Sequence, residues 1–166
     1  DLAIVYMGHN DVLTRSARPY RDLFAAWQRG DDAAVRVSAV LGRSRLYLGL
    51  RFFVSALAGQ EQGRAVPTEH ARDNMRAIIE VFRRTDARVL LAVEGLAPDP
   101  SPMQGYGEIL SSLAVDPDVA YVDAARALAD PAAGALFLDD CHLTRAGHVK
   151  LAGVLAQSLR QEGWAP

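Results

Sequence analysis

Three short apolar runs separated by helical patterns constrain the fold of this chain more than any other feature. The runs are DLAIVYM at 1–7, ARVLLAVEG at 87–95 and VAYVDA at 119–124. Their apolar residues are too continuous for a strand with one wet face, so we expect strands that are buried on both faces. Buried strands that alternate with helices form a parallel sheet covered by helices on both sides. The sequence therefore predicts a three-layer α/β domain.

Helical spacing fills most of the remaining chain. It predicts helices over 18–28 and 31–42, another from Ser44 onward, and one after Pro67 that carries Met75, Ile78, Ile79 and Phe82. The last helix is expected to begin near Thr144 and to bury Val149, Leu151, Ala152, Leu155 and Leu159. Between them, the segment from Gly95 to Gly107 is rich in Pro and Gly, and we expect it to be the main loop. It follows the carboxyl end of a strand, where open α/β sheets bind ligands.

The length of 166 residues suits one domain, and we expect a single domain with a helical insertion at about 17–59. Three strands are nevertheless few for such a sheet. A parallel sheet needs its faces covered and its edges protected, so two further strands before Asp1 are expected. The chain also starts directly on a strand and without methionine. We therefore expect a partial domain, cut from a longer protein.

Charge and composition exclude several classes of function. The net charge is -2, with 18 basic and 20 acidic side chains spread along the chain, so no basic stripe is available for nucleic acid. The single cysteine, Cys141, excludes an internal disulfide and a cysteine-cluster metal site. The most apolar run, at 46–59, is shorter than the roughly 20 residues of a membrane-spanning helix and contains Arg51, so we interpret it as a buried helix.

The segment LDDCHLTRAGH at 138–148 places an acid and an imidazole three residues apart, ahead of the last helix. In a Ser-His-Asp relay the carboxylate accepts a hydrogen bond from one imidazole nitrogen while the other nitrogen faces the nucleophile. A tight turn can bring Asp139 and His142 together in this way without any long-range pairing. The alternative is an ordinary polar loop, in which the two are surface residues or a helix cap.

A second polar cluster, GHND, follows the first predicted strand. Asn10 could direct its amide N–H into a pocket as an oxyanion donor, a role worth roughly 3 to 4 kcal/mol in a transition state. Gly and Asn are also common turn residues, so a plain turn is the alternative. His9 could contact substrate or bond only to backbone, and Glu94, at the end of a central strand, could line the cleft or form an ion pair.

The polar residues of the 138–148 segment also raise the question of a metal. Asp140, Cys141, His142 and His148 include zinc-ligand types, but the two histidines are six residues apart, which does not place them on one helical face. We expect no metal here. Cys141 is adjacent to the predicted base and is expected to be a spectator.

Taken together, the two clusters resemble blocks of the SGNH hydrolase superfamily, the GDSL-type esterases and lipases. DLAIVYMGHND resembles the third block, and the resemblance implies that Asn10 is an oxyanion-hole donor, with Gly8 and His9 beside the substrate. LDDCHLTRAGHVKLAGVLA resembles the fifth block, which implies that Asp139 orients the base His142. RSRLYLGLR at 43–51 resembles the helical insertion of larger bacterial members. The family fold implied is a flavodoxin-like parallel sheet.

The chain departs from the family where the nucleophile should be. The first block, a Gly-Asp-Ser segment after the first strand, and the second block, which supplies a glycine donor, are both absent. None of the serines follows a strand in a Gly-Asp context; they are Ser16, Ser38, Ser44, Ser55, Ser101, Ser111, Ser112 and Ser158. We therefore expect the nucleophile to belong to an upstream segment of the same protein, and the isolated chain to be weak or inactive.

The resemblance implies a serine esterase that cleaves a small-molecule or glycan acyl ester through an acyl-enzyme, without a cofactor. A bacterial envelope or secreted location is favoured over a cytoplasmic one. One alternative is an O-acyltransferase that passes the acyl group to a glycan hydroxyl, which an acceptor-dependent product would reveal. The other is a non-catalytic α/β binding module, for which the upstream sequence would lack a strand followed by Gly-Asp-Ser.

Overall fold

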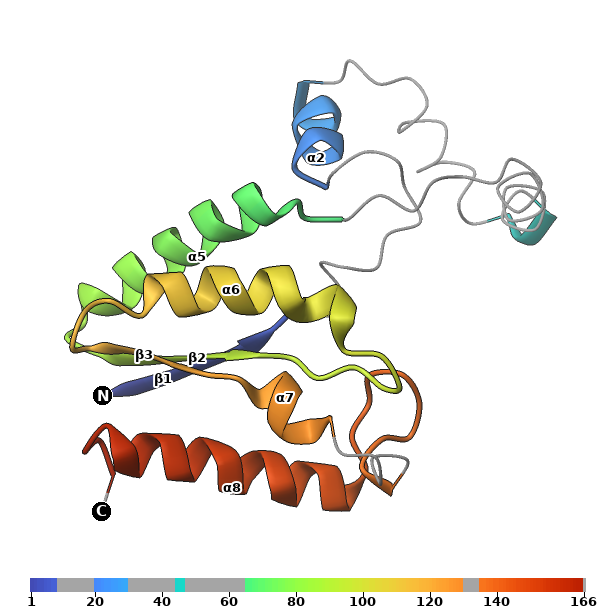
Figure 1. Cartoon of the computed structure of the whole chain (residues 1–166). Coiled ribbons are helices and arrows are strands. Elements are labelled where there is room, and N and C mark those ends of the chain that lie inside the picture. Colours follow the sequence, from blue (N-terminus) through green and yellow to red (C-terminus); the bar gives the residue numbers. More distant parts are fainter. Residues whose placement is uncertain (9–19, 30–43, 47–64, 130–134, 166) are drawn as a thin grey trace. The chain divides into compact units, whose positions relative to one another are not determined.

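The computed structural model describes residues 1–8, 20–29, 44–46, 65–129 and 135–165 (Figure 1). The chain divides into two compact units, one formed by residues 1–12 and 68–166 and the other by residues 13–67. Of the second unit the structure describes helix α2 (Tyr20–Arg29), where a helix over 18–28 was predicted. The predicted helix over 31–42 and nearly all of the one from Ser44 lie outside the described residues, and the insertion at 17–59 stays a prediction.

The first unit contains a parallel sheet whose strand order is β1-β2-β3. Its strands are β1 (Leu2–Met7), β2 (Arg88–Val93) and β3 (Val119–Val122). The register pairs Leu2 with Arg88 and Val89 with Val119, so all carboxyl ends meet at one edge of the sheet. The mixed α/β class and the three parallel strands are thus confirmed.

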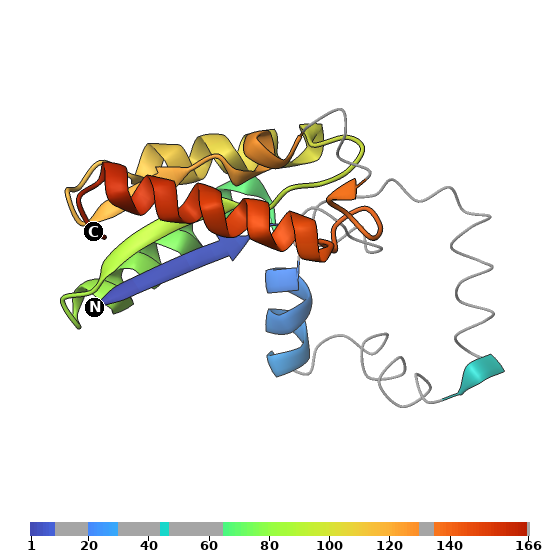
Figure 2. The same ribbon diagram turned by 90° about the horizontal axis from the view of Figure 1, so that it is seen from below.

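Helices cover both faces of this sheet (Figure 1). Helices α5 (Thr68–Arg83) and α6 (Gln104–Leu113) lie on one face, and α7 (Ala124–Leu128) and α8 (Arg145–Gln161) lie on the other. The view from below shows α8 running along the sheet, so that its end lies near Asp1, where the strands begin (Figure 2). None of the helices in the described part of the chain is long and apolar enough to cross a membrane.

The strands differ in burial. Leu90 and Leu91 of β2 are completely buried, as the apolar run predicts. In contrast, Leu2 and Ile4 of β1 are 43% and 46% exposed, so the prediction that this strand is buried on both faces is wrong. The reason is its position, because among the described strands β1 has a neighbour on one side only. Apolar sequence predicts a strand but does not say which strand lies at an edge.

The Pro/Gly loop is shorter than predicted. It ends at Pro100, and a 3₁₀ turn, η1 (Ser101–Met103), leads directly into α6. Pro102 is tolerated because a proline in the first helical turn gives up no internal hydrogen bond. Gly105 and Gly107 then lie inside α6, where burial of Tyr106, Ile109 and Leu110 outweighs the low helix propensity of glycine.

Two helices were predicted with different accuracy. In α5, Met75 and Ile79 are buried, as their spacing predicts. In α8, which begins at Arg145 after the cap Thr144, the prediction for Val149 and Ala152 is wrong, because both are exposed. The face that α8 turns to the sheet instead carries Leu151, Leu155 and Ser158, at i, i+4 and i+7, and Val149 and Ala152 lie off it.

Candidate active site

The turn that carries Asp139 and His142 is closed by a short antiparallel bridge between Phe137 and Leu143. Leu138 N donates a hydrogen bond to the His142 carbonyl over 2.7 Å, which joins the two sides of the turn. Phe137 and Leu143 are themselves buried in one cluster with Leu151 of α8. The core therefore fixes both ends of the turn, while Leu138, Asp139, Asp140 and His142 between them are exposed.

The segment after the turn fixes the start of α8. Thr144 Oγ1 accepts a hydrogen bond from Gly147 N and donates one to the Ala135 carbonyl. The Leu136 carbonyl lies so close to Gly147 that a Cβ at this position would overlap it. The Thr and Gly of the LTRAGH motif thus have a structural role, because they hold the segment before the turn against the helix after it.

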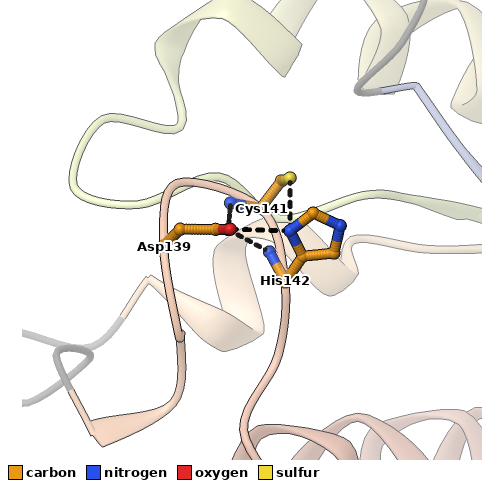
Figure 3. Close-up of polar contacts among 3 residues, drawn as sticks. All are labelled: Asp139, Cys141 and His142. Atoms are coloured by element: carbon orange, nitrogen blue, oxygen red, sulfur yellow. Dashed lines mark hydrogen bonds and ion pairs between the residues drawn. The ribbon is translucent and has the colours of Figure 1, made fainter.

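At the tip, Asp139 is the centre of a local hydrogen-bond network (Figure 3). Its Oδ1 accepts from the backbone N–H of Cys141 over 3.0 Å and from that of His142 over 2.8 Å. Its other oxygen, Oδ2, lies 2.7 Å from Nδ1 of His142. The turn thus brings the two residues into the contact that their spacing predicts. Their catalytic roles stay a prediction.

These hydrogen bonds shift the pKa values of both Asp139 and His142. The backbone N–H groups of His142 and Cys141, followed by the imidazole, hold the pKa of Asp139 well below its ordinary value. The hydrogen bond and the charge of Asp139 raise the pKa of His142. The carboxylate thus stays ionised and accepts the Nδ1 proton, which leaves the lone pair of neutral His142 on Nε2. Nε2 has no hydrogen-bond partner among the described residues, and the side chain is 73% exposed.

Cys141 completes the group, with Sγ 3.5 Å from Nδ1 of His142. Burial, together with the charges of Asp139 and Asp140, raises the pKa of its thiol to about 11. The thiol is therefore protonated at neutral pH and is a poor nucleophile. One ligand atom each from Asp139, Cys141 and His142 lies within 4.8 Å of the others, so these three are the described residues best placed to hold a metal ion.

The tip is anchored to the carboxyl end of β2. Ala97 N donates a hydrogen bond to the Asp140 carbonyl over 2.9 Å. The half-buried Glu94, which follows β2, is close enough for its charge to contribute to the raised pKa values of His142 and Cys141. The predicted substrate-side residue Glu94 and the predicted Asp139–His142 pair therefore lie in one neighbourhood at the carboxyl edge of the sheet.

Tyr6 belongs to the same neighbourhood and was missed by the sequence reasoning. Its hydroxyl accepts a hydrogen bond from Gly95 N over 3.4 Å. Burial raises its pKa, and the nearby Glu94 and Cys141 act in the same direction. A tyrosine two residues before a strand-ending glycine gave no signal by itself, because only the β1–β2 register brings it to Gly95.

The second predicted cluster is described only at its first residue. Gly8 has φ of +139°, a conformation that favours glycine, and a Cβ there would meet the end of the Met103 side chain. The sequence requirement for Gly8 is thus a backbone one. His9 and Asn10 lie outside the described residues, so a position for the predicted oxyanion donor stays a prediction.

The described serines do not supply a partner for His142. No serine hydroxyl in the described ranges forms a hydrogen bond to its imidazole. Ser101 donates its hydroxyl proton to Asp99 and Ser112 donates its own to the Ile109 carbonyl. Ser158 is buried in α8, on the side of the helix that faces the sheet.

Comparisons with protein-family models, with curated proteins and with solved structures found no match to this chain.

Proposed function

We propose that this chain carries the acid–base part of a serine esterase of the SGNH type. The observation that carries the proposal is the Asp139–His142 contact of 2.7 Å, made through Nδ1, with Nε2 open at the carboxyl edge of a parallel sheet. That arrangement is what a general base needs, because one nitrogen is held by a carboxylate and the other is free to take a proton.

In the proposed reaction, a serine from an upstream segment attacks the ester carbonyl while its proton passes to Nε2 of His142. The tetrahedral intermediate then collapses to an acyl-enzyme, and the proton on Nε2 moves to the leaving alkoxide. Water, deprotonated by the same nitrogen, attacks the acyl-enzyme, releases the acid and returns the proton to the serine. Asp139 holds the tautomer throughout and stabilises the imidazolium, and Asn10 is proposed as an oxyanion donor.

The exposure of β1 supports the upstream origin of the serine. Leu2 and Ile4 leave apolar surface at a strand that has one neighbour in the described sheet. Further parallel strands beside β1 would pair with its open edge, and the helices that connect them would cover this apolar face. The loop after such a strand would end at the same carboxyl edge as the Asp139–His142 pair.

Fluorophosphonate labelling of the intact protein, with the adduct located by mass spectrometry, tests the proposal. The expected adduct lies on a serine that precedes Asp1, and its rate of formation falls strongly in His142→Ala. His148→Ala is the matched control, because His148 is an exposed histidine of α8 outside the turn, and it should label at the normal rate. An adduct on a serine of the 166-residue chain would contradict the split site, and the absence of any adduct would contradict an esterase.

A further inference from the structure

A pocket of about 730 Å³ lies between α6, the end of β3 and α7, and β3 is the strand at the opposite edge of the described sheet from β1. Its apolar lining includes Val93, Met103 and Tyr121. Its charged lining comes from Asp99 before η1, Glu108 of α6, Asp123 before α7 and Arg126 of α7. This volume and this mixture of an apolar lining with a few polar groups are typical of small-molecule sites. Neither Asp139 nor His142 lines it.

The three carboxylates of the pocket are partly occupied by local hydrogen bonds. Asp99 accepts from the N–H and the hydroxyl of Ser101, and Glu108 accepts from the Gln104 amide over 3.2 Å. Asp123 accepts from Arg126 N, which caps α7. Since an ionised carboxylate offers about four acceptor positions, each keeps lone pairs for a ligand that donates.

The donors of the pocket include the Tyr121 hydroxyl and the Arg126 guanidinium, which have no partner among the described residues. Tyr121 is half-buried, and burial together with the charge of Asp123 raises its pKa to about 12, which keeps the hydroxyl protonated. A Cβ on Gly107 would come within 3.0 Å of this oxygen, so glycine leaves the space beside it open. Arg126 lies at the exposed rim of the same pocket.

From this lining we infer that the pocket binds an uncharged sugar ring. A sugar hydroxyl both donates and accepts, so one ring can donate to the carboxylates Asp99, Glu108 and Asp123 and accept from Tyr121 and Arg126. Its C–H faces suit the accessible apolar lining, which comes from Pro100, Tyr121 and Ala129. With three carboxylates against one guanidinium, the lining is net negative and disfavours phosphate, carboxylate and sulfate ligands.

The pocket and the candidate active site share the loop Gly95–Pro100. Ala97 in this loop bonds to Asp140 of the turn, and Asp99 and Pro100, at its end, line the pocket. A sugar in the pocket would therefore lie beside the loop that supports the Asp139–His142 pair. Sugar binding is a property of α6, β3 and α7, and it holds whether or not the pair cleaves an ester.

Calorimetric titration of the intact protein with methyl glycosides of glucose, galactose, mannose, xylose, rhamnose and N-acetylglucosamine tests the inference. At least one glycoside should bind in the millimolar range. Tyr121→Phe, which keeps the ring, and Arg126→Gln should each weaken that binding by about five- to tenfold, the effect of one lost hydrogen bond. Arg145→Gln changes an exposed arginine of α8 outside the pocket and should leave the affinity unchanged.

Four further results decide the inference. Failure of every glycoside to bind would overturn it, as would equal affinities in the wild type and in both pocket variants. Tighter binding of glucuronate than of methyl glucoside would also overturn it, because that order belongs to an anion site. Asp139→Asn should bind the glycoside normally; a loss there would move the sugar to the Asp139–His142 turn, and labelling by fluorophosphonate reports on the esterase proposal independently.

Discussion

Two aspartate turns of this molecule use the same local hydrogen bonds for different ends. Asp99 accepts from the backbone N–H of Ser101 over 2.9 Å and from its hydroxyl over 2.8 Å. Asp139 accepts from the backbone N–H and from the imidazole of His142. In both turns these bonds lower the pKa of the aspartate. A well-bonded aspartate with a lowered pKa is therefore no sign of an active site by itself.

The difference lies in the partner side chain and in how the turn is held. The Ser101 hydroxyl donates its only proton to Asp99, at the start of a helical segment. His142 keeps a second nitrogen open, and its turn is fixed by the Phe137–Leu143 bridge and by Ala97. The comparison teaches that an aspartate gains a chemical role when it orients a group that can exchange a proton with a third partner.

The largest expected effect is on the rate of ester hydrolysis, which should fall when Asp139 is changed and not when Asp99 is changed. Asp139→Asn keeps the shape of the side chain but loses the charge that stabilises the imidazolium, and it permits the wrong tautomer. We expect ester hydrolysis by the intact protein to fall roughly 10³- to 10⁴-fold in kcat. Asp99→Asn is the matched change in the other turn and should leave kcat within about threefold of the wild type, because Asp99 bonds to Ser101 and not to His142, and the assay ester carries no sugar for the pocket. Equal losses in the two variants, measured with a chromogenic acetate ester, would mean that the turns do not differ in role.

Stability should depend next on how the His142 turn is held. Gly147→Ala would drive a methyl group into the Leu136 carbonyl, and we expect unfolding to become easier by about 1 to 3 kcal/mol. Gly153→Ala lies in the same helix with nothing within 4 Å of the new Cβ, and it should stabilise by roughly 0.5 to 1 kcal/mol. Urea unfolding gives the free energy of unfolding of both variants. If Gly153→Ala is also destabilised, the loss does not come from the contact with the Leu136 carbonyl.

A smaller loss is expected from the helix cap beside the turn. Thr144→Ala removes the oxygen that accepts from Gly147 N, and such caps contribute about 1 kcal/mol. Ser101→Ala removes an exposed hydroxyl from the other turn and should change the free energy of unfolding by less than about 0.5 kcal/mol. If the two alanine variants unfold at the same urea concentration, Thr144 does not anchor α8.

The sequence predicts those parts of this molecule that depend on nearby residues. Continuous apolar runs located the three strands of the described sheet, and the spacing of Asp139 and His142 predicted a contact that one tight turn can make alone. The edge position of β1 could not be predicted, because the apolar run does not say which strands lie beside it. Gly105 and Gly107 suggested a loop because glycine has a low helix propensity. The segment is helical because α6 buries side chains against the sheet, which the local sequence does not reveal. The contact of Tyr6 depends on the register between β1 and β2. The Tyr121 pocket depends on three elements that meet only in the folded chain, so no local sequence pattern predicts either.

The smallest change expected is in a titration midpoint, and it tests the His142 contact without any assay of activity. The hydrogen bond and charge of Asp139 raise the pKa of His142, so the protonated imidazole is favoured and the pair contributes stability below the ordinary imidazole pKa of about 6.5. That contribution is lost as the pH rises through the raised value, and general-base activity should appear over the same interval. In Asp139→Asn the midpoint, followed by NMR of the imidazole protons, should fall toward the ordinary value, whereas Asp99→Asn should leave it unchanged. An unchanged midpoint in Asp139→Asn would mean that the carboxylate does not hold Nδ1 in solution, and His142 would then resemble any exposed histidine.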